Sequence, residues 1–442
     1  MAFVVAVSYD TAMTPRASTV GRAMLWALAA FVSASCSGIF QRSIPDRPAV
    51  WSVRATGEEV RVGSAERDIT PPIGGYMAGF SLARTSTGIA SPLKVRAMVF
   101  ETGDRRFAIV GIDNLGIMRE DSDWLKAGLS GFANGDVFLC ASHTHAGPDL
   151  IGLWGWYFLT SGRSHDYLRQ LAMATSEAVA EARANAAPAT LVRGQARVPP
   201  DAPVRNPNYA ECFDRRFEVV HARAVADGRP LGTLLHLACH PEVLSRRLSL
   251  LSADFVGDLC DGWKAAGNGQ AVFVNGALGA MVSPRVDKRD QDGAGAMGAQ
   301  LCELAKSALA TAEPLPVDAI EVRRRDVYVP LNTFGLALGR LTLAIPRELF
   351  EGCARTTVGW LRIGSLQAIA VPGEVEPALA ERIRARSGVA DLLLFGLCDD
   401  ELGYLMREQD ARHPEFAYER SMSACVRAGE MVEEALVGPR DW

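Results

Sequence analysis

Two histidines separated by one residue, His143 and His145, are the residues whose type and spacing best suit metal chemistry. They follow the apolar run 137–142. On a straight strand, alternate side chains point to one face, so both imidazoles could enter one pocket. Catalytic zinc binds about three protein ligands and lowers the pKa of its water to about 7. The pair therefore indicates a hydrolytic metal site, with two polar loop histidines as the alternative.

Other polar residues that could complete such a site stand just after apolar runs: His240 after 231–238, Ser283 after 271–275 and Glu374 after 366–371. In open α/β sheets, ligands bind where the strands end, because the loops converge there. We therefore expect these residues at one edge of a sheet. Taken singly, His240 is better explained as a turn residue and Glu374 as a carboxylate at a helix N-terminus.

Strand-like and helix-like stretches alternate along the chain. Apolar runs predict strands at 97–101, 107–113, 137–142, 231–238, 271–275, 366–371 and 392–397. Amphipathic stretches predict helices at 165–184, 254–266, 295–310, 375–387 and 421–436. This alternation favours an α/β fold, with a mixed sheet flanked by helices and the active site at strand C-terminal ends.

Composition narrows the class of protein. The 442 residues are 48% hydrophobic, enough for a large buried core. The net charge is -5 and the sequence has no long Lys/Arg block, so it indicates no basic surface for a nucleic-acid backbone. We therefore expect no nucleic-acid partner. The nine cysteines form no CxxC pair, and we interpret those in apolar runs as small buried side chains. Disulfides are compatible with export, but the sequence does not pair them.

The N-terminus has the features of an export signal. Arg16 and Arg22 precede the apolar stretch 23–32, which is followed by small residues up to Cys36. The stretch is shorter than the roughly 20 residues of a membrane span. We predict a signal peptide at 1–36, a linker at 37–48, a hydrolase domain at 49–442 and an extracytoplasmic location. Cys36 is also a candidate lipid anchor that would hold the protein at a membrane surface.

A series of motifs in fixed order resembles the neutral/alkaline non-lysosomal ceramidase family. The motifs are VGSAERDITP at 62–71, GYMAGF at 75–80, ASHTHAGP at 141–148, ACHP at 238–241, LSAD at 251–254, NGALG at 275–279, VSP at 282–284 and PGE at 372–374. The histidine-rich motif is the most specific. Two departures are that Asp149 and Leu150 stand where glycines are usual, and that the sequence ends at Trp442 without the family's C-terminal β-sandwich domain.

The resemblance implies a set of ligands for one zinc ion: His143, His240, Glu374 and Tyr404. His145 would then be the general acid/base that protonates the leaving amine. Because a neutral phenol is a poor ligand, metal binding would have to favour an ionised or strongly polarised Tyr404.

The resemblance also implies roles around the reacting amide. Arg205 and Tyr418 would stabilise the oxyanion, and Ser283 would hydrogen-bond the substrate. The alternatives are a solvated arginine, a core tyrosine and a turn serine. Asp254 either accepts a hydrogen bond from a zinc-bound histidine or caps the helix that follows it, and we favour capping.

The implied activity is hydrolysis of the amide bond of ceramide or a related N-acyl lipid. A smaller N-acyl substrate is also compatible with the departures at residues 149 and 150. A zinc esterase or lactonase, and a non-catalytic protein that binds lipid or metal, are the alternatives. The sequence makes no prediction of oligomeric state.

Overall fold

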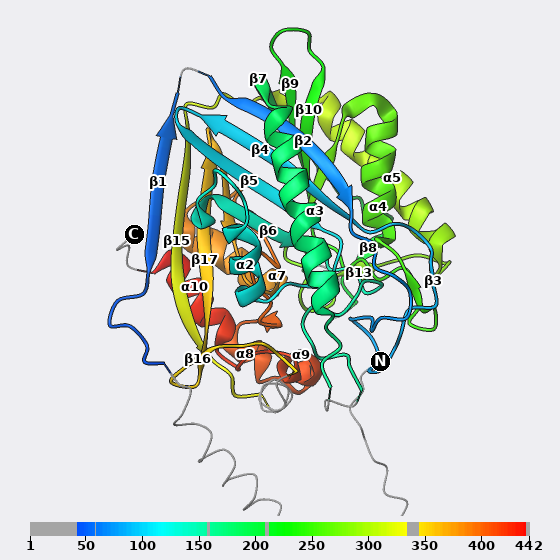
Figure 1. Cartoon of the computed structure of the whole chain (residues 1–442). Coiled ribbons are helices and arrows are strands. Elements are labelled where there is room, and N and C mark those ends of the chain that lie inside the picture. Colours follow the sequence, from blue (N-terminus) through cyan, green and yellow to red (C-terminus); the bar gives the residue numbers. More distant parts are fainter. Residues whose placement is uncertain (1–41, 58, 157–159, 208–211, 334–343, 439–442) are drawn as a thin grey trace, which may run out of the picture.

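A computed structural model describes residues 42–57, 59–156, 160–207, 212–333 and 344–438. Cys36 and the predicted signal peptide lie outside these residues. The chain forms two sheets in face-to-face contact, with helices on their outer faces (Figure 1). The α/β fold with mixed sheets and flanking helices is thus confirmed.

The larger sheet has nine strands in the order β12-β10-β9-β7-β2-β4-β5-β6, with β14 beside β7. Their bounds are Arg61–Asp68 (β2), Lys94–Thr102 (β4), Arg105–Ile112 (β5), Val137–Ala141 (β6), Ala187–Arg197 (β7), Arg216–Ala224 (β9), Pro230–Leu237 (β10), Ala271–Asn275 (β12) and Glu313–Pro314 (β14). The pairs β5/β6 and β10/β12 are parallel and the others antiparallel. Both parallel pairs lie at the ends of the strand order, and these pairs carry the histidines of interest.

The two ends of the nine-stranded sheet come together in space. A Cβ atom at Gly111 of β5 would lie only 2.9 Å from the carbonyl oxygen of Phe273 in β12. The Asn275 amide at the end of β12 donates to the Ser142 carbonyl just after β6, at 2.9 Å. Strand ends that are distant in the sheet order therefore share one site.

The smaller sheet has six strands in the order β1-β15-β17-β18-β20, with β16 beside β17. Their bounds are Val50–Thr56 (β1), Ala319–Pro330 (β15), Leu349–Phe350 (β16), Cys353–Ile363 (β17), Leu366–Ala370 (β18) and Leu393–Phe395 (β20). Only β18/β20 is parallel. Apolar side chains such as Phe138, Val274, Leu361 and Phe395 fill the space between the sheets. The facing sides of the two sheets are therefore buried against each other.

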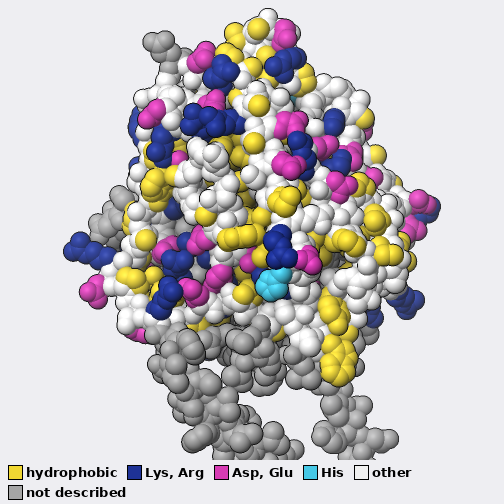
Figure 2. Space-filling model, in the orientation of Figure 1, with side chains coloured by type: hydrophobic (Ala, Val, Ile, Leu, Met, Phe, Trp, Pro, Cys, Tyr) yellow, Lys and Arg dark blue, Asp and Glu magenta, His cyan; other side chains and the backbone are white. Residues whose placement is uncertain are grey.

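Helices cover the outer faces of both sheets. The helices are Arg119–Ala127 (α2), His165–Ala184 (α3), Asp254–Trp263 (α4), Gln291–Ala310 (α5), Pro377–Ser387 (α7), Glu408–Ala411 (α8), Ala417–Ser421 (α9) and Ala428–Val437 (α10). α3 crosses β2 and β4, while α5 packs on β7 and β9; α10 covers β15 and β17 of the smaller sheet (Figure 1). Within the described ranges, no helix is long and apolar enough to cross a membrane. On the face shown in Figure 2, positive and negative side chains are interspersed.

One predicted helix is wrong. The expected helix at 421–436 is instead two helices, because α9 ends at Ser421 and α10 begins at Ala428. The intervening residues make tertiary hydrogen bonds: Ser423 Oγ donates to the Tyr404 carbonyl at 2.6 Å, and Ala424 N donates to the Leu402 carbonyl at 3.0 Å. These contacts hold the Tyr404 segment and take the backbone out of the helical path.

Candidate metal centre

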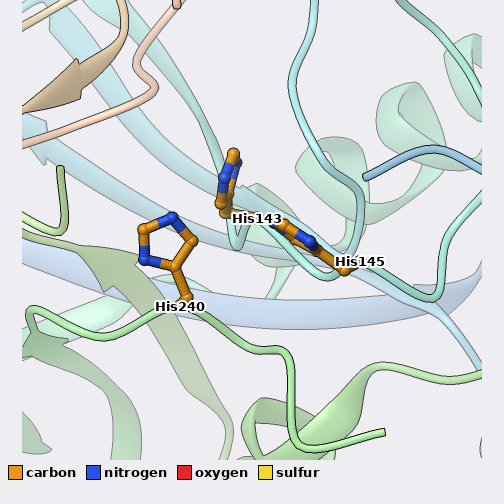
Figure 3. Close-up of side chains that lie close together, drawn as sticks. All are labelled: His143, His145 and His240. Atoms are coloured by element: carbon orange, nitrogen blue, oxygen red, sulfur yellow. The ribbon is translucent and has the colours of Figure 1, made fainter. Parts of the chain in front are cut away.

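Three buried histidines converge after the ends of β6 and β10. Each of His143, His145 and His240 offers one ring nitrogen such that the three nitrogens lie within 4.8 Å of one another (Figure 3). His143 and His145 come from the exit of β6, and His240 from the exit of β10. The predicted position of these residues just beyond strand C-termini is therefore what the structure shows.

His143 does not lie on a straight strand. β6 ends at Ala141, and His143 has left-handed backbone at φ 74°, which is rare for a residue other than glycine. Straight-strand alternation is therefore the wrong reason for the convergence of the two rings, whose centroids lie 5.0 Å apart at 73°. The unusual backbone is held by a 2.8 Å hydrogen bond from His143 N to the Asn114 carbonyl.

His143 and His240 are oriented in the same way. Nδ1 of His143 lies 2.7 Å from the Leu115 carbonyl, and Nδ1 of His240 lies 2.9 Å from the Val282 carbonyl. A carbonyl only accepts, so Nδ1 of each ring carries a proton, and Nε2 is left either to bind a metal or, when it is also protonated, to donate to a carboxylate. Such outer hydrogen bonds fix the tautomer and orientation of metal-binding histidines.

Both Nε2 atoms face one carboxylate oxygen. Oε2 of Glu374 lies 3.1 Å from Nε2 of His240 and 3.5 Å from Nε2 of His143. Burial opposes ionisation of Glu374, but the two histidines outweigh it and bring its pKa below the usual range. Burial likewise lowers the pKa of His240, and the hydrogen bond to Glu374 outweighs burial and raises it.

Tyr404 reaches this carboxylate through a very short ladder. Glu374 in β19 (Glu374–Val375) is the direct parallel partner of Tyr404 in β21 (Tyr404–Leu405). Burial, and then the charge of Glu374, raise the pKa of the Tyr404 phenol well above its ordinary value. The phenol is therefore neutral in this environment, and only a cation beside it would favour its ionised form.

His145 differs from the other two histidines in having no hydrogen-bond partner for either ring nitrogen among the described residues. Burial, and then the two neighbouring histidines, lower its pKa well below the ordinary value. Its ring packs edge-on against Phe80, with centroids 4.9 Å apart. A Cβ atom at Gly79, where φ is +95°, would lie 2.6 Å from Cγ of His145, so glycine is required for this packing.

Arg84 contacts the backbone of the same histidine. Its guanidinium donates to the carbonyls of His145 and Ala78 and lies 4.9 Å from the centre of the Phe80 ring. Burial lowers the pKa of Arg84 to about 10. The sequence interpretation gave Arg84 no role, and quoted Gly79 and Phe80 without one.

Ser283 and Arg205 are brought together by a second short ladder. Ser283 in β13 (Ser283–Pro284) is the antiparallel partner of Arg205 in β8 (Val204–Arg205). Ser283 is buried and follows Val282, whose carbonyl orients His240, whereas Arg205 is exposed. Tyr418 in α9 is 37% exposed, and its ring centroid lies 6.1 Å from that of Tyr404. Tyr418 thus lies beside the Tyr404 end of the cluster.

Asn275 is the residue that links the two histidine-bearing strand ends. Its amide nitrogen donates to the carbonyls of Ser142 and Cys239 at 2.9 and 2.8 Å, and its oxygen accepts from Cys239 N at 3.0 Å. Ser142 precedes His143, and Cys239 precedes His240. The sequence interpretation quoted Asn275 within NGALG without a role; its place at the end of an apolar strand was the available signal.

Asp254 does not accept a hydrogen bond from His143 or His240, which was one of the two roles considered from the sequence. Its carboxylate accepts hydrogen bonds from Leu244 N at 2.9 Å and from Phe255 N at 2.8 Å. The carbonyls of Leu115 and Val282 already occupy the Nδ1 positions of the two histidines. Asp254 therefore holds the start of α4 against the segment that follows His240, a role closer to capping.

The donor set fits a divalent metal ion. Two imidazole Nε2 atoms and a carboxylate are ligands that zinc accepts, and the outer carbonyls orient the imidazoles. The three histidines are one possible ligand group. A second possible ligand group consists of His143, His240, Glu374 and Tyr404, the strand partner of Glu374. In this group, one Glu374 oxygen lies close to the Nε2 atoms of both histidines.

Comparisons with known proteins identify similar folds and a similar sequence family. Residues 60–273 match the family model described as neutral/alkaline non-lysosomal ceramidase, N-terminal. The structure is similar to the crystal structure of neutral ceramidase from Pseudomonas aeruginosa, with a TM-score of 0.71 and 18% identity over 86% of this chain and 73% of that chain. It is similar to a ceramidase complexed with C2 to nearly the same degree, with a TM-score of 0.70, 18% identity, and 86% and 74% of the two chains covered.

No curated protein sequence gave a match. The family match runs from β2 into β12 and includes both histidine-bearing strand ends, and the fold similarity covers 86% of the chain. Residues 60–273 are therefore similar to the N-terminal region of neutral/alkaline non-lysosomal ceramidases, and the described fold is similar to that of neutral ceramidase.

Proposed function

We propose that this protein is a zinc-dependent amidohydrolase that cleaves the N-acyl amide bond of ceramide or a related N-acyl lipid. The observation that carries the proposal is the convergence of two carbonyl-anchored histidines on one buried carboxylate oxygen, with an unpaired histidine beside them. Zinc amide hydrolysis needs such a pairing of metal ligands with a proton-transfer group.

His143, His240, Glu374 and Tyr404 would hold one zinc ion. When bound, zinc lowers the pKa of a coordinated water and polarises a carbonyl oxygen. The alternative ligand set includes His145 in place of Glu374 and Tyr404. We favour the first set because each of its imidazoles is already oriented by a backbone carbonyl, whereas neither ring nitrogen of His145 has a described partner.

His145 would carry the proton during the reaction. Its lowered pKa keeps it neutral at neutral pH, so an unprotonated nitrogen is available to accept a proton from the attacking water. The same nitrogen would then return the proton to the leaving amine. Phe80, Gly79 and Arg84 would hold the ring in the required orientation.

Three residues would bind the substrate around the scissile amide. Arg205 and Tyr418 would donate hydrogen bonds to the oxyanion that forms when water attacks the carbonyl, and Ser283 would hydrogen-bond the amide region. Support comes from the Arg205 and Ser283 pairing beside the His240 anchor, and from the contact between Tyr418 and Tyr404. Burial raises the pKa of Tyr418 to about 12, so its hydroxyl remains a donor at neutral pH.

We further propose an extracytoplasmic protein with a signal peptide at 1–36, a linker at 37–48 and a hydrolase domain at 49–442. Its partner would be the lipid substrate, encountered at a membrane surface, and Cys36 is a candidate lipid anchor. Nucleic acid is not proposed as a partner, given the net charge of -5.

Metal analysis of three purified proteins tests the assigned roles. The wild type should contain one zinc per chain, His143→Ala should lose it, and His145→Ala should keep it while amidase activity falls by roughly 10²- to 10⁴-fold. Loss of zinc from His145→Ala would favour the three-histidine ligand set. A metal-free, active wild type would overturn the proposal.

Matched substrates test the reaction class. Ceramide and an O-acyl lipid with the same acyl chain should be offered to the zinc-loaded enzyme, and fatty-acid release should be measured. We expect the amide to be cleaved. Turnover of the ester alone would make the protein an esterase, and binding without turnover of either would make it a non-catalytic lipid-binding protein.

A further inference from the structure

Two cysteines face each other where the edges of the two sheets meet. Cys140 lies in β6, the edge strand of the larger sheet, and Cys398 lies just after β20, the edge strand of the smaller one. They form an isolated antiparallel β-bridge. Both side chains are buried in the apolar layer between the sheets.

The backbone geometry of this bridge suits a disulfide. Hydrogen bonds flank the pair on both sides, from Ala141 N to the Leu397 carbonyl at 3.2 Å and from Asp399 N to the Leu139 carbonyl at 2.7 Å. Cys140 and Cys398 are therefore a non-hydrogen-bonded pair, for which Cα atoms lie about 4.5 Å apart. That separation falls within the range of roughly 4.4–6.8 Å seen across disulfides.

The sulfur atoms are already in contact. Sγ of Cys140 lies 3.6 Å from Sγ of Cys398. Bonded sulfur atoms are about 2.05 Å apart. The two sulfurs must therefore approach each other by about 1.5 Å, which side-chain rotation can provide without a change in strand register. The register is held independently of sulfur, because the Asp399 carboxylate accepts from Leu139 N at 2.9 Å and lies 2.5 Å from Lys126 Nζ.

We propose that Cys140 and Cys398 form a disulfide that cross-links the two sheets behind the metal centre. Each thiol loses one proton, and the two electrons released reduce the disulfide of an extracytoplasmic thiol–disulfide oxidoreductase or of a small-molecule disulfide to two thiols. Both sulfurs are inaccessible in the folded chain, so the exchange takes place during folding, before the sheets close over the pair. In a reduced, folded chain, burial raises the pKa of the Cys398 thiol well above its ordinary value, which opposes oxidation after folding.

The cross-link would join the two halves of the site. Cys140 precedes His143 by three residues, and Cys398 precedes Tyr404 by six. The inference rests on the proposed export to an oxidising compartment but needs neither metal nor substrate, so it is tested separately from the proposed catalysis.

Peptide mapping of the full chain tests the cross-link directly. The protein should be exported to the periplasm of a bacterial host, treated with an alkylating reagent under denaturing conditions, and digested without reduction. We expect mass spectrometry to find a linked peptide containing Cys140 and Cys398 that disappears on reduction. Recovery of both cysteines as alkylated thiols from the exported protein would overturn the proposal.

Thermal unfolding provides a second measurement on variants. Wild type unfolded with a reductant present should show a Tm lower by about 5 °C than without it, and Cys140→Ser should show no dependence on reductant. Cys260→Ala, which removes another buried cysteine, is the matched control and should keep the wild-type dependence. Equal reductant dependence in wild type and Cys140→Ser would argue against this pair.

Discussion

The two halves of the metal centre are built in different ways. The larger sheet supplies the histidines at the ends of its strands, and a backbone carbonyl fixes each of His143 and His240. Glu374 and Tyr404 come from the separate two-residue ladder β19/β21, whose strands follow β18 and β20 of the smaller sheet along the chain. The orientation of the histidines is set from outside the cluster, whereas the Glu374 carboxylate is oriented by the histidines themselves.

This difference has an energetic consequence. Glu374 is a buried charge whose Oε2 atom faces the two imidazoles, so loss of one histidine leaves it poorly compensated. Loss of the carboxylate leaves the histidines with their carbonyl partners. Before metal binds, the two halves should therefore respond unequally to substitution.

The largest effect is expected for His240→Ala. Zinc content and amidase activity should both be lost, and the metal-free protein should be destabilised by about 3 kcal/mol because Glu374 loses its closest partner. Metal analysis and urea unfolding in the presence of a chelator measure these changes. His236→Ala is the matched control: this buried histidine of the same strand contacts the Leu394 carbonyl and should keep zinc when replaced. Zinc retention by His240→Ala would contradict the ligand set.

A smaller and asymmetric effect is expected for Glu374→Gln. Zinc affinity should fall by roughly 100-fold or more, yet the metal-free protein should be no less stable than wild type, since a neutral amide removes the buried charge. Competition with a chromophoric chelator and urea unfolding measure the two quantities. Glu376→Gln changes a buried carboxyl group that accepts from Arg407 N, and zinc affinity should be unchanged. Destabilisation equal to that of His240→Ala would show that the two halves are equivalent.

The smallest effect of the three is expected for Asn275→Asp. The amide that donates to the carbonyls before both histidines is lost, and a carboxylate faces those carbonyls instead. We expect a loss of about 2 kcal/mol in stability and roughly 10-fold in zinc affinity. Asn185→Asp is the control, because it removes one hydrogen bond from a side-chain amide to the Ser64 carbonyl. It should lower stability less and leave zinc affinity unchanged. Unchanged zinc affinity in Asn275→Asp would remove Asn275 from the positioning of the site.

The sequence predicted the strands that carry the site more completely than the rest of the fold. Apolar runs identified β6, β10, β12 and β18 to within two residues of their observed ends. β7, β9, β15 and β17 were missed because charged and polar residues interrupt their apolar pattern, as in Glu321–Asp326 of β15. Their order and the curling of the larger sheet depend on contacts between distant segments, which no local pattern encodes.

The comparison with the ceramidase family shows the same division between the halves. The family match ends at residue 273, so it includes both histidine segments but stops before Asn275 and the whole β19/β21 ladder. The Glu374 half rests on the fold similarity over 86% of the chain and on the contacts seen here. Sequence signals are strong where ligands are close in the chain and weak where ligands meet through short ladders.

By itself, the sequence determined that His143 and His145 enter one region, because a spacing of two residues at a strand exit keeps their side chains close. Tertiary structure decided which carbonyl faces each ring and which carboxylate lies between His143 and His240. It also paired Glu374 with Tyr404, Ser283 with Arg205, and Cys140 with Cys398. These pairs form only after two sheets have packed together, since two-residue ladders and single bridges leave no periodic pattern in a sequence.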